Sequence, residues 1–220
     1  MCFFDSRALE AYVIGIALGD GNLSSPNGRV VRLRIACDPR YPNLIRAFQA
    51  VLQKVFPNNK VSLVNNPKSI DISVYSNRLK QIMPWKVGGG AKTVQSPCVP
   101  NWIQVSRLYT VECLRGLFQT DGSIYEDRGY LMVNFVTVIA TIANDVMSMI
   151  QRLGFAPHLY RIRQTRPHFD RYNIRLSKSA QEFIDEIRLF KSWHIQRFSA
   201  YGQQRPLRVS GSVAVYGGGC

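Results

Sequence analysis

The sequence of 220 residues predicts an α+β protein that consists of two similar, pseudo-symmetric units. An apolar segment that ends in Asp-Gly occurs twice, at 12–21 and at 113–122. Apolar residues then recur at helical spacing at equal distances after each copy, and segments of alternating apolar and polar residues flank these helices. These three observations indicate a duplicated αββαββα unit, in which a helix and two strands occur twice before a final helix.

The chain is strongly basic. It has 28 Lys and Arg residues against 14 Asp and Glu residues, so its formal net charge is +14. Its hydrophobic fraction of 46% is sufficient for a packed core and argues against a disordered chain. A folded protein with this excess of basic residues is expected to bind a polyanion, and nucleic acid is favoured over a membrane surface.

The sequence lacks the usual features of membrane and secreted proteins. The longest apolar run near the N-terminus, 11–18, is far shorter than the about 20 residues of a transmembrane helix. Residues 1–7 do not have the pattern of a signal peptide, so we expect an intracellular protein of the cytoplasm, nucleoid or organelle matrix. The five cysteines and three histidines show no metal-ligand spacing, so the thiols are interpreted as buried or incidental.

The first unit is predicted to span residues 1–84. Its first helix ends at Asp20. In the segment 29–35, apolar residues alternate with Arg32 and Arg34, which predicts a half-buried strand with a basic open face. The other elements of this unit are predicted as a helix over 44–55, a strand over 69–75 and a short helix near 77–83.

The second unit, 107–201, repeats this order. Its later elements are predicted as a strand near 131–135, a helix over 142–153, strands over 159–163 and 171–176, and a final helix over 180–201. A linker over 85–106 separates the units, and its glycines and prolines argue against helix or central strand. A tail rich in Gly and Ser follows over 202–220.

Asp20 and Asp121 each occupy the C-terminal end of a predicted helix. The helix macrodipole is negative there and disfavours a carboxylate, so a bound divalent cation is expected to compensate. Asp-Gly is also a common turn pair, but its presence at equivalent places in both units favours a functional role. The glycines that follow, Gly21 and Gly122, suit the left-handed residue that ends a helix and turns the chain into the next strand.

Small residues spaced four apart precede both aspartates, namely Gly15 and Gly19, and Gly116 and Thr120. This spacing lets two helix backbones approach closely, so we expect the two helices to pack against each other about a pseudo-twofold axis. Their C-terminal ends would then bring Asp20 and Asp121 together beneath the two sheets. Mg²⁺ with carboxylate and phosphate oxygens fits such a pair, and a site of this kind activates water for displacement at phosphorus.

The two segments resemble the paired motifs of the LAGLIDADG homing endonucleases in their single-chain form. Residues 13–21 fit the nine-residue pattern in the first copy and residues 114–122 fit it in the second. The earlier acidic position of the pattern is Leu18 and Gln119 here, and this position varies in such motifs. The resemblance covers residues 8–200. It implies two antiparallel four-stranded sheets that form a DNA-binding saddle, and a staggered double-strand cut in a long asymmetric site.

The resemblance also implies roles for individual residues. Asp20 and Asp121, with Gly19 and Thr120 beside them, would bind Mg²⁺, and Mn²⁺ or Ca²⁺ could occupy the same site. Lys92 is the candidate for the basic catalytic residue that helps polarise solvent or the scissile phosphate, because 92–100 resembles the lysine-then-Val-Pro segment that precedes the second motif. Candidate accessory residues are Asp38, Thr137, Lys191 and His194.

The open strand faces are expected to contact DNA through basic and polar side chains. An ordinary solvated sheet face is the alternative, but such faces usually mix charges, whereas these segments are nearly free of Asp and Glu. The arginines of both units are expected to project from one side of their strands. The candidate DNA-binding residues are Arg29, Arg32, Arg34, Lys60, Lys68, Ser73, Tyr75, Arg128, Arg161, Arg163, Arg171, Asn173 and Arg175.

The function that these features favour is that of a monomeric, Mg²⁺-dependent endonuclease that cuts double-stranded DNA at a specific site. An RNA maturase of the same fold, which binds intron RNA without cutting DNA, is the alternative. Two carboxylates directed at a polyanion favour the nuclease, because a protein that only binds has no need of them. A transcription regulator on the same scaffold is a third possibility, although no helix-turn-helix segment is evident.

Overall fold

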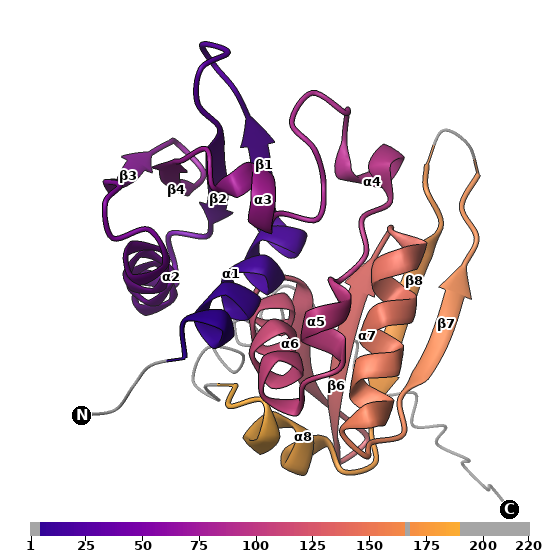
Figure 1. Cartoon of the computed structure of the whole chain (residues 1–220). Coiled ribbons are helices and arrows are strands. Elements are labelled where there is room, and N and C mark those ends of the chain that lie inside the picture. Colours follow the sequence, from indigo (N-terminus) through magenta and orange to yellow (C-terminus); the bar gives the residue numbers. More distant parts are fainter. Residues whose placement is uncertain (1–4, 166–167, 190–220) are drawn as a thin grey trace, which may run out of the picture.

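The computed structural model describes residues 5–165 and 168–189, which form two α+β units side by side (Figure 1). The first unit contains α1 (Ser6–Asp20), β1 (Gly21–Ser24), β2 (Arg32–Cys37), α2 (Pro42–Val55), β3 (Val61–Asn65), β4 (Ile70–Tyr75) and α3 (Leu79–Ile82). The second contains α6 (Arg107–Asp121), β5 (Gly122–Asp127), β6 (Tyr130–Thr137), α7 (Ala140–Arg152), β7 (His158–Ile162), β8 (Arg171–Leu176) and α8 (Ala180–Glu186). No helix within these ranges is long and apolar enough to span a membrane.

Each unit has an antiparallel four-stranded sheet, with the strand orders β1-β2-β4-β3 and β5-β6-β8-β7. The alternation predicted from the sequence is present in the central strands. Leu33 and Ile35 in β2 are buried beneath the helices, as are Val133 and Phe135 in β6, while Arg34 is exposed. The predicted α+β class and the two pseudo-symmetric αββαββα units are therefore confirmed.

Helices α1 and α6 lie at the centre of the molecule and pack directly against each other (Figure 1). A Cβ atom on Gly15 would lie 2.2 Å from the carbonyl oxygen of Cys113, and one on Gly116 would lie 2.5 Å from the carbonyl oxygen of Tyr12. Both distances are too short for any side chain. The close helix contact predicted from the glycine spacing is therefore present, and one hydrophobic core continues through it into both units.

A buried polar cluster lies along the same helix contact and was not predicted from the sequence. The Tyr12 hydroxyl donates a hydrogen bond to Gln119, and the Arg115 guanidinium lies 4.2 Å from the centre of the Tyr12 ring. Glu112 is 5% exposed and forms ion pairs with both Arg115 and Arg188. Because its members come from α1, α6 and the residues after α8, this cluster fixes how these three segments meet.

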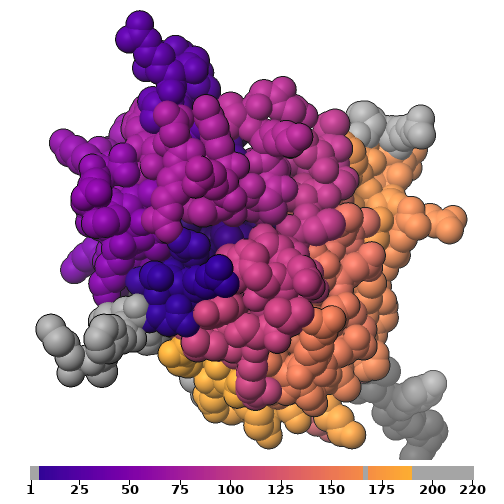
Figure 2. All heavy atoms as spheres, viewed as in Figure 1, coloured from indigo at the N-terminus to yellow at the C-terminus, as the bar shows by residue number. Residues whose placement is uncertain are grey.

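The linker contains two single-turn helices, α4 (Lys92–Gln95) and α5 (Asn101–Gln104), although its Gly and Pro content argued against helix. Contacts with the rest of the protein accompany these turns, because α5 buries Ile103 in the core and Lys92 at the start of α4 donates hydrogen bonds to carbonyl oxygens of α1. The Val99 N–H donates to Asp145 in α7 at 2.7 Å, and the Thr141 hydroxyl donates to the Pro97 carbonyl at 2.7 Å. Figure 2 shows the linker, in magenta, covering the junction between the units on this face.

Several predicted element boundaries need correction. Strand β2 begins at Arg32 rather than at Arg29, because the preceding residues form a turn in which Gly28 has a φ of +71°. Arg29 therefore lies in the connection between β1 and β2. Helix α8 ends at Glu186, and Arg188 in the turn that follows has a φ of +53°, so the prediction of one continuous helix over 180–201 is wrong. Residues 190–220, which include the predicted tail over 202–220, lie outside the described residues.

Replacing Gly116 by Ala should destabilise the protein by about 2 kcal/mol or more, because the new methyl group must push the backbones of α1 and α6 apart. The better helix propensity of Ala offsets only about 1 kcal/mol of this effect. Chemical denaturation measures the change. Asn144→Ala, at an exposed position of α7, is the control and should change the free energy of unfolding by less than about 0.5 kcal/mol. Equal stability of both variants would contradict the close contact.

Candidate active site and nucleic-acid interface

Asp20 and Asp121 are the last residues of α1 and α6. Both helices end in the same way, because the N–H of the following glycine bonds to a carbonyl of the last turn and the chain then enters a strand. Gly21 and Gly122 have φ values of −78° and −82°, so the prediction that they are left-handed is wrong. A Cβ atom at either position would instead meet a carbonyl oxygen of the last helical turn, at 2.4 Å and 2.3 Å. A Cβ atom on Gly19 would lie 3.0 Å from Oδ2 of Asp121. The Asp121 carboxylate therefore lies against the last turn of α1, beside the residue that precedes Asp20.

Lys92, the first residue of α4, directs its ammonium group at the C-terminal end of α1. Its Nζ donates hydrogen bonds to the carbonyl oxygens of Ala17 at 3.1 Å, Leu18 at 2.8 Å and Gly19. A cation is favourable at this negative end of a helix. The centre of the Trp85 ring lies 5.4 Å from Nζ, so the aromatic ring covers another side of the ammonium group.

Burial lowers the pKa of Lys92 to about 8, and the carboxylates of Asp121 and Asp20 act in the opposite direction. Both aspartates therefore lie within electrostatic range of the same ammonium group. This places the ends of α1 and α6 and the linker lysine in one site. The ammonium group is mostly protonated at pH 7, but it loses its proton more readily than an ordinary lysine.

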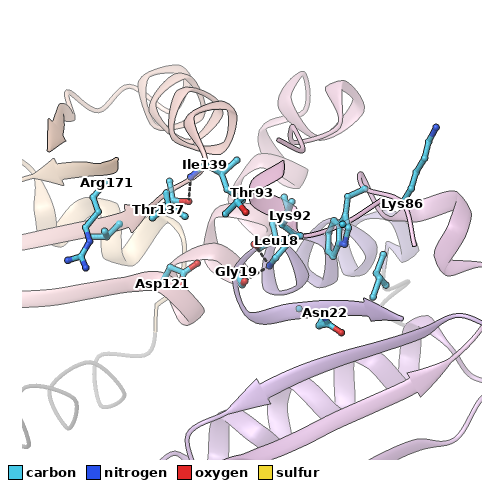
Figure 3. Close-up of a pocket in the computed structure, with 17 residues that line it drawn as sticks. Leu18, Gly19, Asn22, Lys86, Lys92, Thr93, Asp121, Thr137, Ile139 and Arg171 are labelled. Carbon is cyan, nitrogen blue, oxygen red and sulfur yellow. Dashed lines mark hydrogen bonds between the residues drawn. The ribbon is translucent and has the colours of Figure 1, made fainter. Parts of the chain in front are cut away.

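A hollow of about 550 Å³ opens beside these groups, between the two units (Figure 3). Its lining includes Gly19, Lys92 and Asp121, together with Thr137 at the end of β6 and Arg171 at the start of β8. In Figure 3 the Asp121 side chain lies between Gly19 and Thr137. The lining thus combines oxygen ligands with three cationic side chains, those of Lys86, Lys92 and Arg171, a chemistry that suits a phosphodiester group.

The face of the first sheet that points away from the helices carries Arg32 and Arg34. Arg32 lies opposite Ser24, and its Nε donates to the Ser24 hydroxyl at 3.1 Å. Ser73, a predicted DNA contact, lies opposite Arg34 on this face but is only 6% exposed. The other candidates of this unit are exposed, namely Arg29, Lys60, Lys68 and Tyr75.

The open face of the second sheet carries Arg171, Asn173 and Arg175, because the residues between them face the helices. Arg161 pairs directly with Tyr172, which lies on the other face, and its guanidinium is 6.0 Å from the centre of the Tyr172 ring. The prediction that Arg161 shares a face with Arg171 and Arg175 is therefore wrong. A strand of alternating residues does not by itself specify its pairing register, and a shift of one residue reverses every side chain.

Two further arginines of this unit lie outside the strands. Arg163 follows the end of β7, and Arg128 occupies the turn between β5 and β6 with a φ of +53°. Both residues are exposed, so they extend the basic character of the second unit beyond its sheet.

The expectation that the open faces are nearly free of acid is also wrong. Arg175 pairs with Asp127 at 2.7 Å, and Arg34 lies 3.5 Å from Asp71. Asp127 lies on β5 and its partner Arg175 on β8, while Asp71 lies on β4 and its partner Arg34 on β2. The sequence pattern within any one strand therefore did not reveal these ion pairs.

Both units match family models. Residues 9–83 match the model described as the WhiA LAGLIDADG-like domain, and residues 109–188 match the model described as a LAGLIDADG-like domain. Each match contains one of the two motif aspartates. The chain belongs to the LAGLIDADG family and carries two motifs. None of the curated proteins matches it in sequence.

Solved structures share the fold of this LAGLIDADG protein at low sequence identity. I-DmoI in complex with DNA and Mn superposes with a TM-score of 0.63 at 15% identity and covers 84% of this chain and 99% of its own. The N-terminal LAGLIDADG domain of DUF199/WhiA gives 0.57 at 12% identity, covering 87% and 88%. Full-length DUF199/WhiA from Thermatoga maritima gives 0.58 at 12% identity, covering 95% of this chain and 65% of its own.

The LAGLIDADG site has the donor chemistry that a divalent cation requires. Among the described residues no three His, Cys, Asp or Glu side chains cluster. However, Mg²⁺ commonly binds through one or two carboxylates together with water and substrate phosphates. The carboxylates of Asp20 and Asp121 and the carbonyl groups at the two helix ends supply such oxygens, and the I-DmoI structures were solved with Mn, Mg and Ca.

The accessory candidates of the LAGLIDADG site separate into three groups. Thr137 lines the hollow, and its hydroxyl accepts a hydrogen bond from the Ile139 N–H at 3.2 Å. Asp38 follows β2 and pairs with Arg40 at 2.6 Å. Lys191 and His194 lie outside the described residues. Sequence reasoning missed Trp85, whose contact with Lys92 could not be anticipated because it depends on how the linker folds.

The free energy of unfolding should depend on pH through Lys92. Its pKa is about 8 when folded and near 10.5 ordinarily, so between these values the unfolded chain binds a proton that the folded protein has lost. Stability of wild type relative to Lys92→Met should therefore rise by about 2 kcal/mol from pH 7 to pH 9.5. Denaturation in EDTA at both pH values measures this difference. A difference that stays constant or falls would show that burial does not lower this pKa.

Proposed function

We propose that this LAGLIDADG protein is a divalent-metal-dependent endonuclease that binds a long, asymmetric double-stranded DNA site and cuts both strands. The observation that carries the proposal is the meeting of Asp20, Asp121 and Lys92 at the contact between α1 and α6, beside a hollow between two basic sheets. We further propose that it acts as a monomer, because one chain already contains both motifs, and that it acts inside the cell, where its proposed DNA substrate lies.

In this proposal the residues divide the work between binding and chemistry. Arginines of the open faces hold the duplex through base edges and phosphates. Asp20 and Asp121, with carbonyl oxygens at Gly19 and Thr120, would hold the divalent cation, which activates water and stabilises displacement at phosphorus when it is bound. Lys92 supplies positive charge at the same place, and its lowered pKa suits the transfer of a proton near neutral pH.

Recognition of nucleic acid without cleavage is the second candidate function. The match of residues 9–83 to the WhiA LAGLIDADG-like domain favours this candidate, and an RNA maturase belongs to the same class. Selection of cleaved molecules from a randomised DNA library with Mg²⁺ distinguishes the two candidates. A discrete long consensus among the cleaved molecules is expected for the nuclease, whereas absence of cleaved product, together with retention of DNA or RNA in a separate selection for binding, would favour the second candidate.

Asp20→Asn and Asp121→Asn should each abolish double-strand cleavage but leave DNA affinity within about threefold of wild type. The physical reason is that each substitution removes a charged ligand and leaves the arginines of the sheets in place. Cleavage of supercoiled plasmid and electrophoretic mobility shifts measure the two effects.

The matched control for these two variants is Asp38→Asn, which removes a carboxylate that pairs with Arg40 instead. It should retain more cleavage than either motif variant. If Asp20→Asn and Asp121→Asn lose binding and cleavage in equal measure, the two aspartates support the fold rather than the reaction.

Lys92→Met should slow cleavage by about 10²-fold or more while the dissociation constant changes little, because Nζ contacts the helix end and not the open sheet faces. Single-turnover cleavage at saturating protein measures the effect. Lys86→Met is the control, because Lys86 lines the same hollow but is exposed, unlike Lys92, and this variant should cut at nearly the wild-type rate. Normal cutting by Lys92→Met would show that the lysine is not part of the chemistry.

A further inference from the structure

We propose that Asp127 and Asp71 are specificity-determining positioning residues, which hold two arginines of the DNA-reading faces in fixed orientations and restrain them from binding phosphates at random. This inference rests on the proposed recognition of DNA. It goes beyond that proposal because it assigns a role to two acidic residues on surfaces that would meet a polyanion.

The first pair lies across the open face of the second sheet. Arg175 projects from β8 and reaches over β6 to Asp127 at the end of β5, with 2.7 Å between Nη2 and Oδ2. Its guanidinium also lies 5.8 Å from the centre of the Tyr125 ring. The hydrogen bond to Asp127 raises the pKa of Arg175, so the arginine remains charged. The side chain is thereby held along the sheet instead of extending freely into solvent.

The second pair lies on the open face of the first sheet. Arg34 in β2 lies 3.5 Å from Asp71 in β4, and the Asp71 side chain is 9% exposed whereas that of Arg34 is 44% exposed. The Ser69 hydroxyl donates a hydrogen bond to Asp71 at 3.2 Å, which fixes the carboxylate. The arginine therefore presents its remaining donors to solvent from a fixed base.

A carboxylate on such a face weakens attraction to every DNA sequence alike, because it repels phosphates. It improves discrimination when it orients an arginine, since a guanidinium reads guanine only with both donors aligned to O6 and N7. An unrestrained arginine would instead turn toward the nearest phosphate, which is present at every sequence. A loss of general affinity in exchange for discrimination is a common basis of specificity.

The test uses the Asp127→Asn variant. Its dissociation constants for the duplex with the selected consensus sequence and for duplexes of random sequence are measured across a salt series, with Ca²⁺ in place of Mg²⁺. The variant should bind duplexes of random sequence about threefold to tenfold more tightly than wild type does. The salt dependence of this binding should steepen by about one unit, because the released arginine contacts one more phosphate. Discrimination between the selected and random duplexes should fall by about tenfold.

Glu186→Gln is the matched control, because it produces the same change in net charge at an ion pair with Arg107 on the helical side. It should change random binding by less than about twofold. Asp71→Asn tests the second pair, and thermal unfolding of each variant shows that it is folded. Asp127 is the cleaner position because its side chain is 43% exposed.

Two results would overturn the inference. If Asp127→Asn and Glu186→Gln tighten random binding by the same factor, the effect is one of net charge alone. If random binding and its salt dependence do not change in Asp127→Asn, the carboxylate does not restrain Arg175. Both measurements use random duplexes and need no cleavage, so they test the inference even if the nuclease proposal fails.

Discussion

The backbones of α1 and α6 touch where Gly15 and Gly116 have no side chains, and the rest of the molecule is arranged around this contact. Among the described residues, the packing of α1 against α6 is the most extensive contact between the two units. Their closeness brings the C-terminal carboxylates together and sets the spacing of the sheets that flank them. A larger side chain at either glycine would separate the two halves of the site as well as the two halves of the core.

This contact creates an electrostatic problem at the helix ends. Two carboxylates and two sets of terminal carbonyl groups converge where the macrodipoles are negative. Lys92 offsets part of this field by donating to three carbonyls of α1, but its burial makes the protonated state unfavourable. The site therefore favours additional positive charge, which a divalent cation would supply, and it holds a lysine that is ready to lose a proton. The converging negative charge and the buried ammonium group thus lower the stability of the fold at the place where the proposed chemistry occurs.

The two sheets extend from this centre as basic but not purely basic surfaces. Ion pairs such as Arg175 with Asp127 show that the positive charge is organised by acidic side chains from neighbouring strands. The polar cluster around Glu112 and Arg115 has a related role inside the molecule, because it holds α1, α6 and the segment after α8 in one arrangement. Ion pairs thus fix the positions of charged side chains both on the surface and in the interior.

The amino-acid sequence by itself determined most of the helices and central strands, the duplication and the place of the motif aspartates. The elements follow from local periodicity within one segment, and the duplication follows from comparing the segments 12–21 and 113–122. Residues 171–176, for example, form β8 as predicted, because alternation over a short range defines a strand.

Only the tertiary structure decided which side chains share a surface. The face of Arg161 depends on the register between β7 and β8, and the partners of Arg34 and Arg175 lie on other strands. The environment of Lys92 likewise depends on how the linker packs against α1 and against Trp85. These relations join residues that are far apart in the chain, and no local pattern encodes the distance between them.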